Sequence, residues 1–207
     1  MGKKAVRVVR NPDIIKILAD PVRREILRLT STKPHTETQL AMKLNLSKPS
    51  VGHHLQVLLK AGLIKIVEAK VGRYGILEKY YESTATLFLE DPDNIPLDLQ
   101  RYFVHRYIER LRGMLNAFYV AGYIGEDFEI SPENLEELAK DFAKHIVKVG
   151  EKYENIEVDV GRENLFIKVC GEALRLMMAT DKWRDLLKQI KVPIKEDSQT
   201  SHLLTEK

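Results

Sequence analysis

The sequence contains a single cysteine, Cys170, in 207 residues. One thiol cannot form an intramolecular disulfide, an all-cysteine metal site or a dithiol redox sensor within one chain. No run of residues approaches the roughly 18 consecutive apolar side chains of a membrane-spanning helix. The basic N-terminus is not followed by an apolar signal core, because Arg10, Asn11 and Asp13 interrupt it. These absences predict a cytoplasmic protein that does not enter a membrane.

Catalytic and metal-binding motifs are also missing. No His-Glu-x-x-His, Gly-x-Ser-x-Gly or Gly-x-x-x-x-Gly-Lys-Ser/Thr pattern occurs, so nothing indicates a metalloprotease, a serine hydrolase or a P-loop enzyme. Asp141 and His145 lie four residues apart, as do His105 and Glu109. Each pair lacks a third ligand nearby and is expected to be a surface pair. The sequence therefore predicts no enzyme, no cofactor and no metal site.

Charge is unevenly distributed along the chain, although the net charge is only +3. Residues 1–83 contain 16 Lys and Arg against 7 Asp and Glu, a net charge of +9. The remainder contains 17 against 23, a net charge of −6. A basic first segment beside an acidic second one favours contact of the first with a polyanion, and the alternative is an uneven solvated surface.

Cap residues divide the first part of the chain into short helices. The first is an apolar helix over residues 14–18. Asp20 has the position of an N-cap and Pro21 that of the first helical residue, where a missing N–H costs nothing. A helix over residues 22–30 is expected to follow, and residues 31–35 are expected to form a loop.

Two further helices are joined by a tight turn. Thr36 and Gln39 have the spacing of a capping box, in which each side chain satisfies the backbone N–H of the other. The helix that they open ends at a turn formed by residues 45–46, and Ser47 caps the helix that follows. Two short helices joined by so tight a turn predict a helix-turn-helix.

The pattern changes from helical to strand-like at residue 63. Residues 63–68 and 76–81 are rich in β-branched and aromatic side chains. Gly72 and Gly75 lie between them and suit a hairpin loop. Helices followed by a β-hairpin predict a winged helix over residues 1–83.

Beyond about residue 83 the apolar period becomes helical again. Residues 156–160 are either a brief strand or an extended linker. Helices are expected over residues 97–122, from residue 131 to at least 149, over 163–180 and over 181–191.

The predicted fold is mainly α with a small β-hairpin. It comprises an N-terminal winged-helix DNA-binding domain (residues 1–83), a C-terminal all-helical subdomain for dimerisation and effector binding (84–194) and a flexible tail (195–207). The C-terminal helices offer more apolar faces than one small subdomain buries, so a part of these faces is expected to meet a second chain.

The helix after the tight turn has two contrasting faces. At about 100° per residue, Val51, Leu55 and Leu58 fall on one side, whereas His53 and Gln56 fall on the other. The first side is expected to join a core. The second is polar, and small near its start, which suits a helix that enters the major groove with its N-terminal residues at the base edges.

Ten residues of this helix and of the hairpin are expected to contact DNA. Gly52 allows close approach, although a mid-helix glycine costs roughly 1 kcal/mol relative to Ala; the alternative is an exposed helix with an incidental glycine. On the hairpin, basic residues are expected to contact phosphate or the minor groove, although they could simply solubilise the tip. The expected contacts are Lys48, Pro49, Ser50, Gly52, His53, Gln56, Lys60, Lys70, Arg73 and Tyr74.

His53 and His54 are adjacent but are not expected to form a metal site. Neighbouring positions on a helix diverge by about 100°, so the two imidazoles cannot easily chelate one ion. We expect His54 at the edge of the core, hydrogen-bonded to backbone, and His53 in contact with the groove or a phosphate.

The pattern Leu46-Ser47-x-x-Ser50-Val51-x-x-His54-Leu55-x-x-Leu58-x-x-Ala61-Gly62-Leu63-Ile64 resembles the recognition-helix signature of ArsR-type winged-helix transcriptional repressors. The upstream run Leu-Ala-Asp-Pro-Val-Arg-Arg-Glu-Ile-Leu at residues 18–27 is similar to that family's start. Gly72-Arg73-Tyr74 lies where the family carries its wing. The resemblance covers residues 11–83. It implies a dimeric, operator-binding regulator of the kind that a ligand often releases from DNA.

The chain departs from the metal-sensing members of that family. Those members place a cysteine pair in the first helix of the helix-turn-helix, whereas residues 36–42 contain no cysteine. The resemblance is therefore to a variant that does not sense thiophilic metals, and the sequence leaves open whether a small-molecule effector exists.

Two functions remain compatible with the sequence. The first is a sequence-specific transcriptional regulator, a repressor, acting on a pseudo-palindromic operator in double-stranded DNA as a homodimer held by its C-terminal helices. The second is a winged helix that serves as a protein-interaction module in a larger complex and has no operator of its own. The charge distribution, the small polar helix face and the basic hairpin favour the first. An affinity for duplex DNA that is absent or independent of salt would favour the second.

Overall fold

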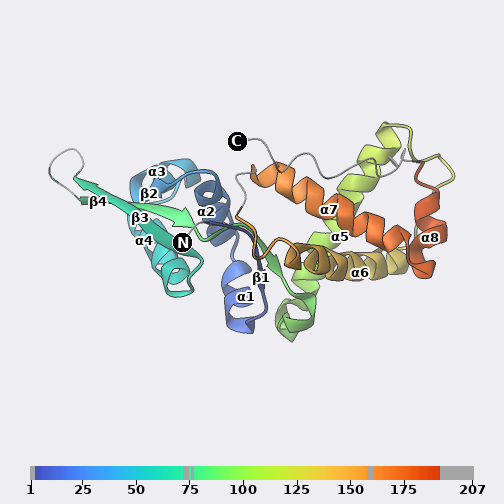
Figure 1. Cartoon of the computed structure of the whole chain (residues 1–207), viewed down its shortest axis with the longest axis horizontal. Coiled ribbons are helices and arrows are strands. Elements are labelled where there is room, and N and C mark those ends of the chain that lie inside the picture. Colours follow the sequence, from blue (N-terminus) through green and yellow to red (C-terminus); the bar gives the residue numbers. More distant parts are fainter. Residues whose placement is uncertain (1–2, 72–74, 76, 158–160, 192–207) are drawn as a thin grey trace.

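The computed structural model describes residues 3–71, 75, 77–157 and 161–191. The described chain is mainly helical, with a few short strands, and confirms a winged helix followed by a helical region. Figure 1 shows an elongated molecule in which the winged-helix elements occupy one end and the long C-terminal helices the other.

The first two helices begin at capping side chains, of which Asp20 was predicted and Asn11 was not. In α1 (Pro12–Leu18) the side chain of Asn11 accepts hydrogen bonds from the first backbone N–H groups. In α2 (Pro21–Thr32) Asp20 Oδ1 accepts from the backbone N–H of Arg23 at 2.9 Å. Both contacts satisfy amide groups that a helix start leaves without partners.

The expected loop over residues 31–35 is wrong, because α2 continues to Thr32 and His35–Thr36 form the short strand β2. Thr30 and Ser31 are buried within α2. Their hydroxyls donate to backbone carbonyls three or four residues earlier, Thr30 to Ile26 at 2.7 Å and Ser31 to Arg28 at 2.8 Å. Such bonds satisfy hydroxyl groups inside a helix, so polar residues there do not mark its end.

The helix-turn-helix consists of α3 (Glu37–Leu44) and α4 (Lys48–Lys60). The capping box is confirmed: the N–H of Gln39 donates to Thr36 Oγ1 at 3.2 Å, and the N–H of Thr36 donates to Gln39 Oε1 at 3.0 Å. Asn45 adopts a left-handed conformation with φ 52°, which asparagine tolerates better than most residues and which makes the tight turn possible. Ser47 Oγ caps α4 by accepting from the N–H of Ser50.

The wing is formed by β3 (Ile64–Val71) and β4 (Leu77–Ser83), which pair antiparallel. With β2 they form a three-stranded sheet in the order β2-β4-β3. The register shifts between Ile66 and Glu68, as in a β-bulge. The expected hairpin is confirmed, and both strands run beyond the predicted ranges. Gly72 lies outside the described residues, whereas Gly75 has a positive φ of 72°.

A second, parallel sheet was missed by the sequence analysis. It pairs β1 (Lys4–Val9) with β5 (Ala85–Glu90), in a register that places Val6 opposite Leu87. The helical period was expected to return from residue 83, but a strand intervenes. Five of the six residues of β5 are buried, and a strand buried on both faces shows no alternation of apolar and polar residues.

The helical region starts after a short 3-10 helix, η2 (Pro92–Asn94). Ser131 caps the second long helix as predicted, by accepting from the N–H of Asn134 at 3.1 Å. Glu157, in the stretch for which a strand or a linker was considered, makes an isolated bridge with Lys4. The helices are α5 (Leu97–Val120), α6 (Pro132–Glu151), α7 (Arg162–Met178) and α8 (Asp181–Lys188).

Two hydrophobic clusters form the core. One lies within the winged helix and includes Leu55 and Leu58 of α4 together with Phe103 of α5. The other lies between β1, β5 and helices α5–α8, with Phe142 among its fully buried side chains. Within the described residues, no helix is both long and apolar enough to cross a lipid bilayer.

Candidate nucleic-acid interface

Helix α4 presents the two faces that its sequence predicts. Val51, Leu55 and Leu58 are buried against the winged-helix core, with at most 1% of each side chain exposed. His53 and Gln56 are exposed on the other side of the helix. The predicted orientation of α4 is therefore confirmed, while contact of the outer face with DNA stays a prediction.

The N-terminal end of α4 is small and open. Lys48 and Pro49 are exposed, Ser50 is half-buried, and Lys60 is exposed at the other end of the helix. Pro49, His53, Gln56 and Lys60 share the outward side of the helix, and Lys48 and Ser50 flank its start. We call these six residues the α4 face.

Gly52 lies beside the side chain of Glu37 in α3. A Cβ atom at this position would lie 3.3 Å from Oε1 of Glu37. That distance is slightly tighter than an ordinary contact, and the flexible carboxylate would have to shift by a few tenths of an ångström to make room. Glycine at this position therefore leaves Glu37 in place.

On the wing, Lys70 is exposed but not free. Its Nζ lies 2.9 Å from Oε1 of Glu68 and 5.5 Å from the ring centroid of Tyr80. The hydrogen bond to Glu68 raises the pKa of Lys70, so the amine is charged at neutral pH. Arg73 and Tyr74 lie outside the described residues.

Two basic residues near this surface were not singled out from the sequence. Lys43 is exposed in the last turn of α3, and Lys79 is exposed on β4 opposite Ala69. The sequence could have indicated Lys79, because this residue lies within the predicted strand 76–81 on the same hairpin as Lys70. It could have indicated Lys43 by the position of this residue in the helix immediately before the tight turn.

The expected backbone hydrogen bond of His54 is wrong. His54 is half-buried as predicted, but its Nδ1 atom is buried without a hydrogen-bond partner. The ring instead contacts that of His53 edge-on, with 5.8 Å between centroids.

The side chains of Asp141 and His145 do not pair with each other. His145 Nδ1 lies 2.8 Å from the backbone oxygen of Asp141, while the Asp141 carboxylate accepts from Lys182 Nζ at 2.7 Å and Trp183 Nε1 at 2.8 Å. The expected surface pair is therefore wrong, because α8 supplies the partners. Burial raises the pKa of Cys170 to about 11, which keeps the thiol protonated. Across the part of the chain that the structure describes, no three His, Cys, Asp or Glu side chains gather as a metal site requires.

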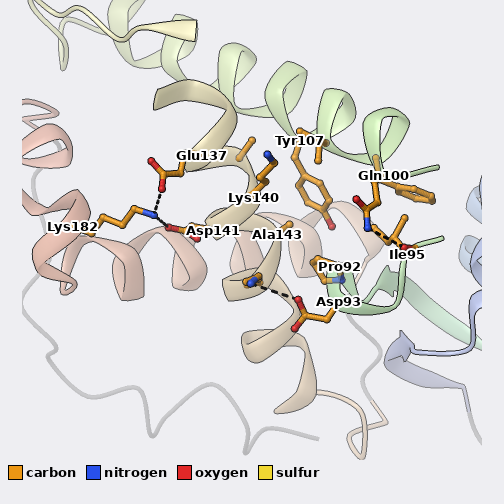
Figure 2. A pocket seen from close by; sticks show the side chains of 14 residues that line it. Pro92, Asp93, Ile95, Gln100, Tyr107, Glu137, Lys140, Asp141, Ala143 and Lys182 are labelled. Carbon is orange, nitrogen blue, oxygen red and sulfur yellow. Dashed lines mark hydrogen bonds and ion pairs between the residues drawn. The ribbon is translucent and has the colours of Figure 1, made fainter. Parts of the chain in front are cut away.

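A cavity of about 330 Å³ lies away from α4, between η2, α5 and α6. Figure 2 shows Lys182 reaching Glu137 and Asp141 at one end of it, and Tyr107 and Gln100 of α5 at the other. Its volume is at the lower end of the range typical of small-molecule sites. The cavity is therefore one candidate for an effector site; a larger hollow of about 900 Å³ lies along α5, next to Glu136 and Lys140 of α6.

One protein family and two known proteins are similar to this chain. The family described as "Helix-turn-helix domain" matches residues 18–67. The transcriptional repressor SdpR of Bacillus subtilis (strain 168) is 34% identical over 82 residues, which cover 40% of this chain and 83% of SdpR. A solved structure of the Adhesin competence repressor (AdcR) from Streptococcus pyogenes aligns over 68% of this chain and 84% of that one. Its sequence identity of 18% and TM-score of 0.31 are too low to inform the C-terminal helices. The match to SdpR spans most of that protein, and this chain belongs to the ArsR-type winged helix-turn-helix transcriptional regulators.

Proposed function

We propose that this protein is a transcriptional repressor, not an enzyme, which binds a pseudo-palindromic operator in double-stranded DNA as a homodimer. The observation that carries the proposal is the α4 face, which is exposed, small at its N-terminal end and rich in hydrogen-bonding groups, on a helix seated in the core by Leu55 and Leu58. A helix of this kind fits the major groove. SdpR, which is 34% identical to this chain over 82 residues, is itself named a transcriptional repressor.

Within this proposal the residues divide into two roles. Gln56 and His53 face outward from the middle of α4 and read base edges, since glutamine can bond adenine through two hydrogen bonds. The start of α4, with Lys48, Pro49, Ser50 and Gly52, enters the groove and allows close approach to the base edges. Lys60 at the other end of α4, and Lys70, Arg73 and Tyr74 on the wing, position the protein on the phosphates.

The C-terminal helices hold the two copies together in this proposal. Helix α5 exposes large apolar side chains at both ends: Leu97 is 85% exposed and Val120 is 86% exposed. Tyr102 (39% exposed) and Tyr119 (52%) lie near these two ends, and in this proposal both ends contact the second copy. A dimer would place two α4 helices about 34–36 Å apart, which matches successive major grooves on one side of the duplex.

Three further assignments belong to the same proposal. The chain divides into a DNA-binding domain (1–83), a dimerisation and effector subdomain (84–194) and a tail (195–207), with β1 and β5 joining the first two. The cavity beside α5 and α6 accommodates a small-molecule effector. The protein acts in the cytoplasm.

The dimer is tested by sedimentation of the whole chain at micromolar concentration. We expect a dimer, and we expect Leu97→Glu together with Val120→Glu to shift it toward monomer, because two charges would enter an apolar interface. Met42→Glu is the matched control: Met42 is 78% exposed but lies on α3, so the dimer should persist. A monomeric wild-type chain would contradict the proposal. The fragment 1–83 is a poor substitute, since it removes the β5 partner of β1.

DNA binding itself is tested by titrating duplex DNA at several salt concentrations. Lys70→Ala should weaken binding to all sequences alike and reduce the slope of log affinity against log salt by about 1 per half-site, since one phosphate contact releases about one counterion. Lys188→Ala is the control, because Lys188 is exposed in the last turn of α8 and lies outside the winged helix. The ion pair between Lys70 and Glu68 must open before Lys70 can contact a phosphate. If Lys70→Ala left the slope of log affinity against log salt unchanged, the wing would not be part of the DNA interface. Salt-independent or absent duplex binding by the wild type would favour the protein-interaction module instead.

A further inference from the structure

A second, smaller cavity of about 50 Å³ lies at the junction of the winged helix and the C-terminal helices. Four arginines line it: Arg24 of α2, Arg106 and Arg110 of α5, and Arg162 of α7. Glu90 of β5 is the one carboxylate among its described lining residues. We call these four side chains the arginine cluster.

Glu90 cannot balance the arginine cluster. Its side chain is 6% exposed, and its Oε1 atom accepts from Arg24 at 2.6 Å and lies 4.0 Å from Arg106. One carboxylate oxygen thus serves two guanidinium groups. The Nε atom of Arg24 is buried without any hydrogen-bond partner, so donor capacity remains unused.

The positive charges of the other two arginines, Arg110 and Arg162, are even less well neutralised by carboxylates. Arg110 stacks 4.5 Å from the ring centroid of Phe166 and 5.3 Å from that of Tyr107, and it makes no ion pair within the described residues. Arg162 donates to the backbone oxygen of Thr86 at 2.8 Å. Its nearest carboxylate, that of Glu163, is 3.9 Å away and largely exposed to solvent.

The cluster is electrostatically strained without an added anion. Burial lowers the pKa of Arg106, and the charge of Arg24 lowers it further. Burial also lowers the pKa of Arg162; Glu163 opposes this, while Arg28, Arg110 and Arg24 add to it. Partly buried like charges are costly unless opposite charges or hydrogen bonds compensate them.

We propose that the arginine cluster binds a phosphate-sized oxyanion between α2, β5, α5 and α7. The cavity volume equals that of about three to five water molecules, which is the size of one tetrahedral oxyanion. Guanidinium groups present paired N–H donors that match phosphate oxygens, and stacking on aromatic rings holds such a group in place. Phe166 and Tyr107 do this for Arg110. The oxyanion would contact both the winged helix, through Arg24, and the C-terminal helices.

Calorimetric titration of the whole chain with inorganic phosphate tests the site, with NaCl keeping the ionic strength constant. We expect one phosphate per chain, and binding at least about tenfold weaker in Arg110→Gln, a loss of one charge-assisted contact. Arg110→Lys keeps the positive charge but loses the planar guanidinium group with its paired N–H donors. Its affinity for phosphate should therefore lie between that of the wild type and that of Arg110→Gln. Arg112→Gln is the matched control: Arg112 is on the same helix, exposed and paired with Glu109, and its variant should bind like the wild type.

Circular dichroism of each variant establishes that it is folded. Glycerol phosphate distinguishes two sources of the same group. If glycerol phosphate binds more weakly than inorganic phosphate, the ligand is a free oxyanion. If it binds more tightly, the ligand is the phosphate group of a larger molecule. Either result supports the site. The proposal would be overturned if phosphate gave no more heat of binding than chloride does. It would also be overturned if Arg110→Gln and Arg112→Gln lost the same affinity for phosphate. Because no DNA is present, the outcome is independent of the proposed repressor function.

Discussion

Leu58→Ala is expected to lower the free energy of unfolding by about 2–5 kcal/mol, the usual effect of truncating a buried leucine. Leu58 has no exposed surface and lies in the winged-helix core together with Val51 and Leu55. The variant loses the transfer free energy of three carbon atoms and leaves a cavity that rigid neighbours fill only in part. Because this contact seats α4, loss of duplex binding should accompany the loss of stability.

Gln56→Ala provides the internal control for this prediction. Gln56 is exposed on the same helix, two residues from Leu58, so its replacement should change the free energy of unfolding by no more than about 0.5 kcal/mol. Urea titrations of both variants give the comparison. A larger loss in Gln56→Ala than in Leu58→Ala would show that the core-facing and outward faces of α4 have been exchanged.

The same Gln56→Ala variant is expected to lower affinity for the best operator by about 1–3 kcal/mol, because a bidentate contact to a base is lost while its partner atoms remain. The preference at one base pair of each half-site should relax, and binding to scrambled duplexes should hardly change. This separates Gln56 from Lys70, whose loss should weaken every duplex alike.

A matched glutamine on another surface controls for general effects of the substitution. Gln189 is exposed after the end of α8, far along the chain from α4, and Gln189→Ala should leave operator affinity unchanged. Fluorescence anisotropy with the specific and a scrambled duplex measures both variants. Equal affinity of Gln56→Ala and wild type for the specific site would remove Gln56 from the reading surface.

Local hydrogen bonding made the winged helix predictable from sequence. Asp20, Thr36 and Ser47 each cap a helix through a bond to a backbone N–H at most three residues away. Such contacts depend on sequence spacing alone, so the helix starts could be read directly. The outward and core-facing sides of α4 could also be predicted from sequence spacing, because the 3.6-residue period of a helix determines which side chains lie on the same side.

Contacts between distant segments were not predictable in the same way. Strand β5 carries no alternation because its partner β1 and the surrounding helices bury both faces, and β1 comes from the other end of the winged helix. The arginine cluster gathers residues from positions 24 to 162, which no spacing rule connects. The role of Gly52 depends likewise on Glu37 of the neighbouring helix.

The α4 face as a base-reading surface is tested most directly by selecting bound duplexes from a random pool, with the whole wild-type chain and with Gln56→Ala in parallel. The account predicts that the wild type selects a pseudo-palindrome with half-sites about 10–10.5 base pairs apart, centre to centre. It further predicts that Gln56→Ala selects the same arrangement with one relaxed position in each half-site. Absence of any enriched sequence with the wild type, or identical preferences of the two proteins at every position, would contradict it.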